Sequence, residues 1–140
     1  MNSMPATSKL ELDEIFDLVL DDNIKGIPGG TPPFRLGDIG SKRWNILDGD
    51  MPFPVAVLKR TCLDNNRNWM RNFVSEACVE IAPHGKTTMA PQLFDLQLAD
   101  GAWGITAATA THIHVYRRFG VKNILLANQL VGPEKQKTFA

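Results

Sequence analysis

Residues 83–88 place three side chains with useful chemistry close to a single lysine, Lys86. The amine of a lysine, when neutral, attacks a carbonyl carbon and forms a Schiff base with an aldehyde. His84 can orient or polarise a bound group, and the hydroxyls of Thr87 and Thr88 can donate hydrogen bonds to an anion. This pattern predicts a site at which Lys86 holds an aldehyde cofactor.

Each of these residues also has an ordinary structural interpretation. Lysines are mostly exposed, so base rates alone favour Lys86 as an ordinary solvated loop residue. His84 would then be a neutral surface residue, and Thr87 and Thr88 would cap the helix that follows. The local sequence alone leaves both interpretations open.

The lysine follows a short apolar run, residues 79–82, which has the length and branching of a buried strand. Pro83 and Gly85 end that run, so Lys86 is expected just beyond the strand's C-terminal end. In α/β folds, ligands bind at the carboxyl ends of the strands. The position of Lys86 therefore favours the functional interpretation.

Strand and helix patterns alternate from residue 54 onward, and the predicted strands begin about 20 to 25 residues apart. This spacing is typical of βα units, which pair their strands in parallel through right-handed crossovers. In the first helix, Trp69, Met70, Phe73 and Val74 are expected to face inward. We predict strands at 54–58, 79–82, 101–107 and 123–127, and helices at 63–77, 91–99 and 109–119.

The first part of the chain differs in composition and in predicted structure. Apolar residues at helical spacing predict an amphipathic helix over residues 10–20, and residues 1–8 are expected to be disordered. Residues 23–54 are rich in glycine and proline, which indicates an extended connector. Trp44 is expected to anchor it, with Ile46 and Leu47 buried beside it. We therefore expect two regions, an N-terminal helix and connector over residues 1–53 and the βα region over residues 54–140.

The composition excludes several classes of partner. Fifteen basic and fifteen acidic residues cancel to a formal charge of zero, which argues against binding to nucleic acid or to an acidic membrane surface. No apolar run is long enough for a membrane span, so we expect a soluble, cytoplasmic protein. Cys62 and Cys78 lack any metal-binding spacing and are expected to be reduced thiols.

Three segments together resemble a known family. They are Pro83-His84-Gly85-Lys86-Thr87, Gly101-Ala102-Trp103-Gly104-Ile105-Thr106-Ala107-Ala108-Thr109 and Ile124-Leu125-Leu126-Ala127-Asn128. They resemble the D-serine dehydratase and D-threonine aldolase family, within the alanine-racemase-like (fold type III) pyridoxal phosphate enzymes. The resemblance covers about residues 54–132. It implies a TIM-type barrel with a second, mostly β domain, and the strand at 54–58 could belong to that second domain.

The resemblance implies that Lys86 forms the internal aldimine with pyridoxal phosphate. His84, Thr87 and Asn128 are the candidate cofactor contacts, although a strand-end amide such as Asn128 could instead close a turn. The expected activity is a lyase or deaminase acting on a small D- or β-hydroxy amino acid, as in a D-serine dehydratase. D-threonine aldolase-type cleavage is one alternative, and a non-catalytic truncated fragment is another.

The resemblance also indicates what the chain lacks. A (β/α)₈ barrel takes ~250 residues, so this chain is expected to supply only the first three or four βα units, with a further helix opening at Glu134. In the family, later loops hold most of the cofactor phosphate, and a divalent metal, zinc or manganese, binds near the C-terminus. His112 and His114 are two residues apart on a predicted helix and do not form a metal pair. For the complete protein a homodimer is expected.

Overall fold

The computed structural model describes residues 9–131, which form two compact units. One unit is Leu12–Arg60, and the other consists of residues 9–11 and 61–131. The predictions for residues 1–8 and for the helix at Glu134 lie outside the described residues. The proposed domain boundary after residue 53 stays a prediction.

The Leu12–Arg60 unit opens with a short helix, α1 (Asp13–Phe16), and not with the long helix expected over residues 10–20. Residues after α1 leave the helix because their backbone pairs with a later segment. The strand β1 (Val19–Leu20) pairs antiparallel with β2 (Phe34–Arg35). The two strands thus occupy hydrogen-bonding groups that a longer helix would have used itself.

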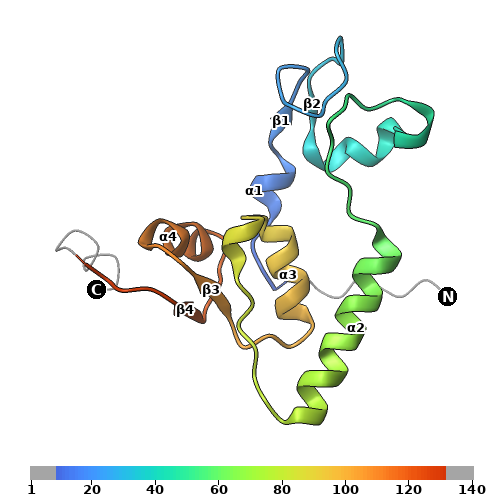
Figure 1. Ribbon diagram of the computed structural model, residues 1–140. Helices are drawn as coiled ribbons and strands as arrows, with labels where there is room; N and C mark the ends of the chain where they lie inside the picture. Colours follow the sequence, from blue (N-terminus) through green and yellow to red (C-terminus); the bar gives the residue numbers. More distant parts are fainter. Residues whose placement is uncertain (1–8, 132–140) are drawn as a thin grey trace. The chain divides into compact units, whose positions relative to one another are not determined.

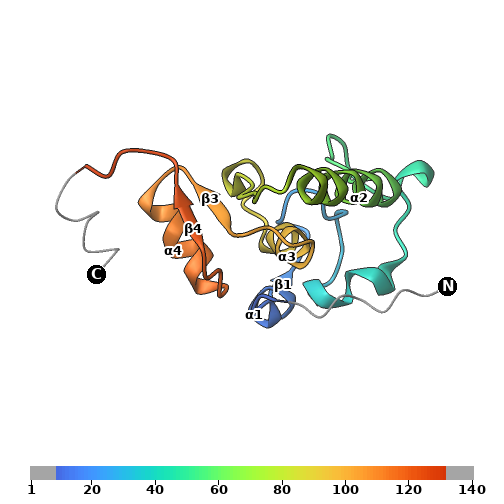
Figure 2. The ribbon, with the colours of Figure 1, turned by 90° about the horizontal axis from the view of Figure 1, so that it is seen from below.

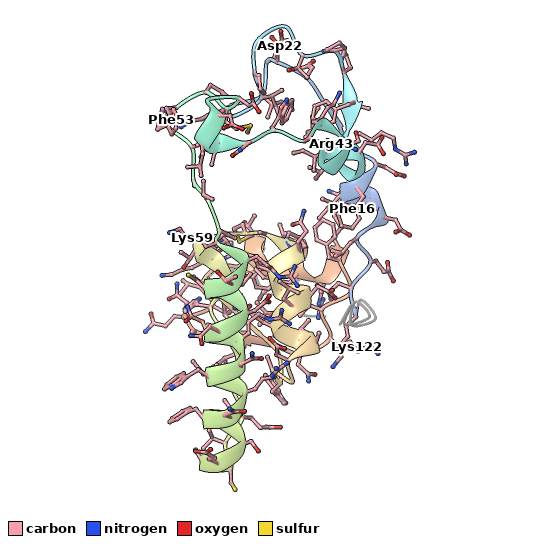
Figure 3. All side chains as sticks on the ribbon, turned by 90° about the vertical axis from the view of Figure 1, so that its right-hand side faces the viewer. Phe16, Asp22, Arg43, Phe53, Lys59 and Lys122 are labelled. Atoms are coloured by element: carbon pink, nitrogen blue, oxygen red, sulfur yellow. The ribbon has the colours of Figure 1, made fainter. Side chains whose placement is uncertain are left out.

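The connector that follows is irregular, as its glycine and proline content predicts. Its regular pieces are two 3₁₀ helices, Leu36–Lys42 and Ile46–Asp48. Trp44 does act as an anchor, because its ring meets Phe34 edge-to-face at 5.7 Å between centroids. The predicted burial of Leu47 is wrong, because its side chain is 91% exposed. Phe53, labelled in Figure 3, is also exposed.

The second unit begins with two helices, after which short strands and a helix alternate (Figure 1). Strands β3 and β4 pair in parallel, with Ile105 opposite Ile124, which confirms the predicted parallel pairing of these two strands. Residues 54–58 form no strand, and the predicted barrel stays a prediction. The elements are α2 (Arg60–Ala77), α3 (Pro91–Ala99), β3 (Ile105–Ala107), α4 (Ala110–Arg118) and β4 (Ile124–Leu126).

Residues 81–84 run alongside β3 in the same direction. The Trp103 N–H donates to the Ile81 carbonyl at 2.9 Å, and the Thr106 N–H donates to the Pro83 carbonyl at 2.7 Å. His84 forms a parallel bridge with Thr106. The strand expected at residues 79–82 therefore lies two residues later, and it makes a third parallel segment that pairs with β3.

The core of this unit lies where α4 packs on the two strands (Figure 2). Its largest fully buried side chains are Tyr116, Phe94, Ile105 and Ile113. The rings of Phe94 and Tyr116 meet edge-to-face at 5.1 Å between centroids, a favoured aromatic geometry. Helix α4 and the strands therefore form a close-packed platform.

Helix α2 is present as predicted but does not bury the expected residues. Trp69 and Phe73 stack on each other at 5.5 Å, yet they are 62% and 49% exposed. No residue of α2 is buried, and in Figure 3 many side chains of this green helix project outward. Val74 is half-buried and, with Leu63, lines a cavity shared with α3, so the Trp69 and Phe73 part of the apolar face is the part left exposed.

Charged side chains connect α2 to the end of α3. Arg67 binds both carboxylate oxygens of Asp100, at 2.6 and 2.9 Å, and Arg71 binds the same carboxylate at 2.9 Å. The hydrogen bonds that Arg67 donates to Asp100 raise the pKa of Arg67 above its ordinary value, so the guanidinium stays charged.

Among residues 9–131, no helix is both long and apolar enough to cross a membrane.

Candidate functional site

The carboxyl ends of the three parallel segments meet at one edge of the sheet, because parallel strands all end on the same side. Lys86 follows segment 81–84, Thr109 follows β3, and Asn128 follows β4. In α/β folds this edge is where ligands bind. The side chain of Lys86 is exposed there.

Lys86 lies in a single 3₁₀ turn, Gly85–Thr87, whose first residue must be glycine. Gly85 is buried, and a Cβ atom at that position would lie 2.5 Å from the Tyr116 hydroxyl and 2.8 Å from the Ile105 Cγ2. Glycine is therefore needed here for close approach. The backbone after the turn closes back on it, since the Met89 N–H donates to the Gly85 carbonyl at 3.0 Å.

The hydroxyl of Tyr116 packs against Gly85 in this turn. Tyr116 was not among the residues predicted for the site. It is 0% exposed, and its hydroxyl donates to the Thr106 carbonyl at 3.3 Å. Burial raises the pKa of the Tyr116 phenol above its ordinary value, so the group is a neutral donor at neutral pH. The helical spacing of Tyr116 from Ile113 could have indicated its burial, but not its contact with Gly85.

His84 and Thr87 lie on either side of the Gly85–Lys86 pair and are both exposed. His84 is held at the edge through its backbone bridge to Thr106. The capping alternative for the threonines does not hold for the next helix, because the N-cap of α3 is Ala90. The exposed imidazole of His84 thus lies two residues before Lys86, and the exposed hydroxyl of Thr87 lies one residue after it.

Asn128 lies at the same edge, where its amide joins the two strand ends. Its Nδ2 donates to the Ala108 carbonyl at 2.9 Å, and its Oδ1 accepts from the Gln129 N–H at 2.8 Å. These bonds fit the turn-closing role that the sequence left open. Asn128 therefore holds β3 and β4 together at the edge, and a cofactor contact stays a prediction.

The two histidines of α4 differ in exposure, since His112 is half-buried and His114 is exposed. The Nδ1 of His112 accepts a hydrogen bond from the Ala108 N–H at 3.3 Å. The Thr109 side chain caps the helix by accepting from the His112 N–H. Within the described residues, no group of three or more histidine, cysteine, aspartate or glutamate side chains could hold a metal ion.

Other features of the unit lie apart from this edge. A cavity of about 450 Å³ beside α2 and α3 is lined by residues that include Leu63, Val74 and Leu96, and Lys86 is not among them. Cys62 and Cys78 are both exposed free thiols, as predicted. These features add no group to the carboxyl edge.

The groups at the edge fit an aldehyde cofactor in their chemistry. Lys86 offers an exposed primary amine, the group that reacts with an aldehyde. His84 and Thr87 offer polar side chains within two residues of it, and the buried Gly85 lets the backbone turn sharply beneath the lysine. This set of donors is compatible with a carbonyl compound that also carries polar substituents.

Comparison with known proteins finds similarity among solved structures. No family model matches the sequence, and no curated protein sequence matches it. Among solved structures, the chain is similar to the crystal structure of D-threonine aldolase from Filomicrobium marinum, with a TM-score of 0.62 and 26% sequence identity. The match covers 64% of this chain but only 24% of the aldolase chain. The likeness supports the D-threonine aldolase side of the predicted resemblance and does not extend to D-serine dehydratase.

Proposed function

We propose that this chain supplies the lysine-bearing edge of a pyridoxal phosphate-dependent enzyme that cleaves a small β-hydroxy D-amino acid, as an aldolase does. The observation that supports it most is the place of Lys86, exposed just beyond the carboxyl end of a parallel segment. The similar solved structure is a D-threonine aldolase, which favours cleavage of the α–β bond over the other reactions considered.

In this proposal each residue at the edge has a distinct role. Lys86 binds the cofactor's aldehyde and afterwards can hold or move a proton with its free amine. Bound pyridoxal phosphate supplies an electron sink for negative charge at the substrate's α-carbon. His84 and Thr87 hold polar groups beside the lysine, and Asn128 keeps the ends of β3 and β4 together.

The wider proposal follows the same resemblance. The whole protein would be a cytoplasmic homodimer with a TIM-type barrel, and a divalent metal would bind to residues beyond those of this edge. Dehydration and deamination of a D-serine-like substrate is the second candidate reaction. It uses the same lysine, but the comparison with known structures does not favour it.

The first experiment asks which lysine holds the cofactor. The full chain is mixed with pyridoxal phosphate, reduced with borohydride and digested, and the modified lysines are identified by mass spectrometry. We expect modification to concentrate on Lys86, together with an absorption band at roughly 410 to 430 nm that is lost in Lys86→Ala.

Lys122 is the matched control. It is exposed, as Figure 3 shows, and it precedes β4, so it lies at the amino end of the strands while Lys86 lies at the carboxyl end. Lys122→Ala should leave the band unchanged. Equal modification of Lys86 and Lys122 would favour the non-catalytic alternative and overturn the proposal.

The second experiment separates the two reactions. Aldol cleavage of D-threonine releases glycine and acetaldehyde, whereas dehydration of D-serine releases pyruvate and ammonia. For the whole protein with cofactor bound, we expect aldehyde from D-threonine and no pyruvate from D-serine. Pyruvate without aldehyde would show that deamination is the reaction.

A further inference from the structure

We infer that Tyr116 is a positioning residue, which holds the turn that carries Lys86 through its buried hydroxyl. The inference rests on the proposed function of Lys86. It adds a residue of α4, 30 positions further along the chain, to the machinery at the carboxyl edge.

The hydroxyl of Tyr116 lies where two backbone segments meet. On one side it lies against Gly85, close enough that a Cβ there would come within 2.5 Å of it. On the other side it donates to the carbonyl of Thr106, the residue that bridges to His84. One phenol thus contacts both the turn and β3, the strand that pairs with the segment before the turn.

The ring itself is fixed, so the hydroxyl has a defined place. Tyr116 is 0% exposed, and Phe94 meets it edge-to-face at 5.1 Å. Lys86 by contrast is exposed, so the backbone turn beneath it does most to set the direction of its side chain. Removing the hydroxyl should loosen that turn without touching the lysine.

A purely structural role for Tyr116 makes a different prediction. If the phenol only fills the core, its loss should lower the stability of the unit and affect every lysine through unfolding. If it positions Lys86, its loss should change Lys86 relative to other lysines in the same folded molecule. The ratio of cofactor trapped on Lys86 to that on Lys122 separates these two cases.

The experiment compares Tyr116→Phe with Ile113→Val in the full chain. Tyr116→Phe keeps the ring and removes the hydroxyl. Ile113→Val shortens another fully buried side chain of the same helix, one that is not among the atoms nearest to Gly85. We expect Tyr116→Phe to lower the Lys86-to-Lys122 ratio about fivefold, the effect of losing one hydrogen bond, and Ile113→Val to leave the ratio unchanged. An unchanged ratio in Tyr116→Phe, or an equal fall in both variants, would overturn the inference.

Gly85→Ala keeps the test valid if Tyr116→Phe is poorly folded. A Cβ at Gly85 would lie 2.5 Å from the same hydroxyl, so Gly85→Ala should lower the ratio by itself. Since both substitutions act on one contact, Tyr116→Phe should add little loss to Gly85→Ala. Fully additive losses would contradict the inference.

The outcomes also separate this inference from the proposed function. A wild-type chain that traps cofactor equally on all exposed lysines overturns both. A wild-type chain that prefers Lys86, and keeps that preference in Tyr116→Phe, overturns only the role of Tyr116.

Discussion

Helices α4 and α2 make an instructive pair, because both follow from apolar residues at helical spacing, yet only α4 buries them. Ile113 and Tyr116 of α4 are fully buried against β3 and β4, whereas Trp69 and Phe73 of α2 remain largely exposed. Periodicity predicts that a helix has an apolar face, but burial requires a partner for that face. For α4 the partner is the adjacent sheet of β3 and β4. The side chains buried between them include Tyr116, whose hydroxyl lies against Gly85 in the Lys86 turn.

The largest effect should come from emptying the core beneath α4. Tyr116→Ala removes a fully buried ring and its contact with Phe94, so we expect a loss of about 3 to 5 kcal/mol in the free energy of unfolding. Urea unfolding followed by far-UV circular dichroism would measure it. A loss as small as that of an exposed substitution would mean that α4 does not pack on the strands as described.

Gly85→Ala should have the next largest effect. The added Cβ would come within 3 Å of both Tyr116 and Ile105, so we expect a loss of about 1 to 3 kcal/mol and weaker cofactor binding at Lys86. Gly29→Ala is the control, because a Cβ there meets nothing within 4 Å. Similar stability of the two variants would show that the turn has room to move.

The pH dependence of stability offers a smaller effect that reports on one group. Burial raises the folded-state pKa of Tyr116 above its ordinary value of 10.0, so the stability from the neutral phenol is complete below pH 10.0. It should be lost as the pH rises through the raised pKa. Tyr116 is the sole tyrosine, so the tyrosinate absorbance of the chain titrates this group directly.

Tyr116→Phe is the control for this titration and should lose less stability over the same alkaline range. An ordinary tyrosinate titration in the folded wild-type chain would contradict the burial of the phenol.

The smallest effect should come from α2. Trp69→Ala removes a side chain that is 62% exposed, so we expect a change within about 0.5 kcal/mol despite the size of the ring. The urea measurement used for Tyr116→Ala applies here too. A loss comparable to that of Tyr116→Ala would show that α2 packs against a partner in solution.

The sequence predicted local features well where neighbouring residues alone decide them. The bounds of α3 match the prediction at both ends, and Pro91 opens that helix as its fixed φ angle favours. Prediction failed where a segment pairs with residues distant in the sequence. Val19–Leu20 was expected in a helix, but it forms a strand that pairs with residues 34–35. It failed also for Leu47, whose burial depended on contacts that the sequence pattern does not specify.

By itself, the sequence determined that a lysine follows an apolar strand-like run, bounded by proline and glycine, and that βα units surround it. Short-range geometry and hydrophobic periodicity are sufficient for those conclusions. Only the tertiary structure brought Tyr116 of α4 against Gly85 and joined the ends of β3 and β4 through Asn128. Contacts of this kind depend on packing between segments distant in sequence, which no local pattern records.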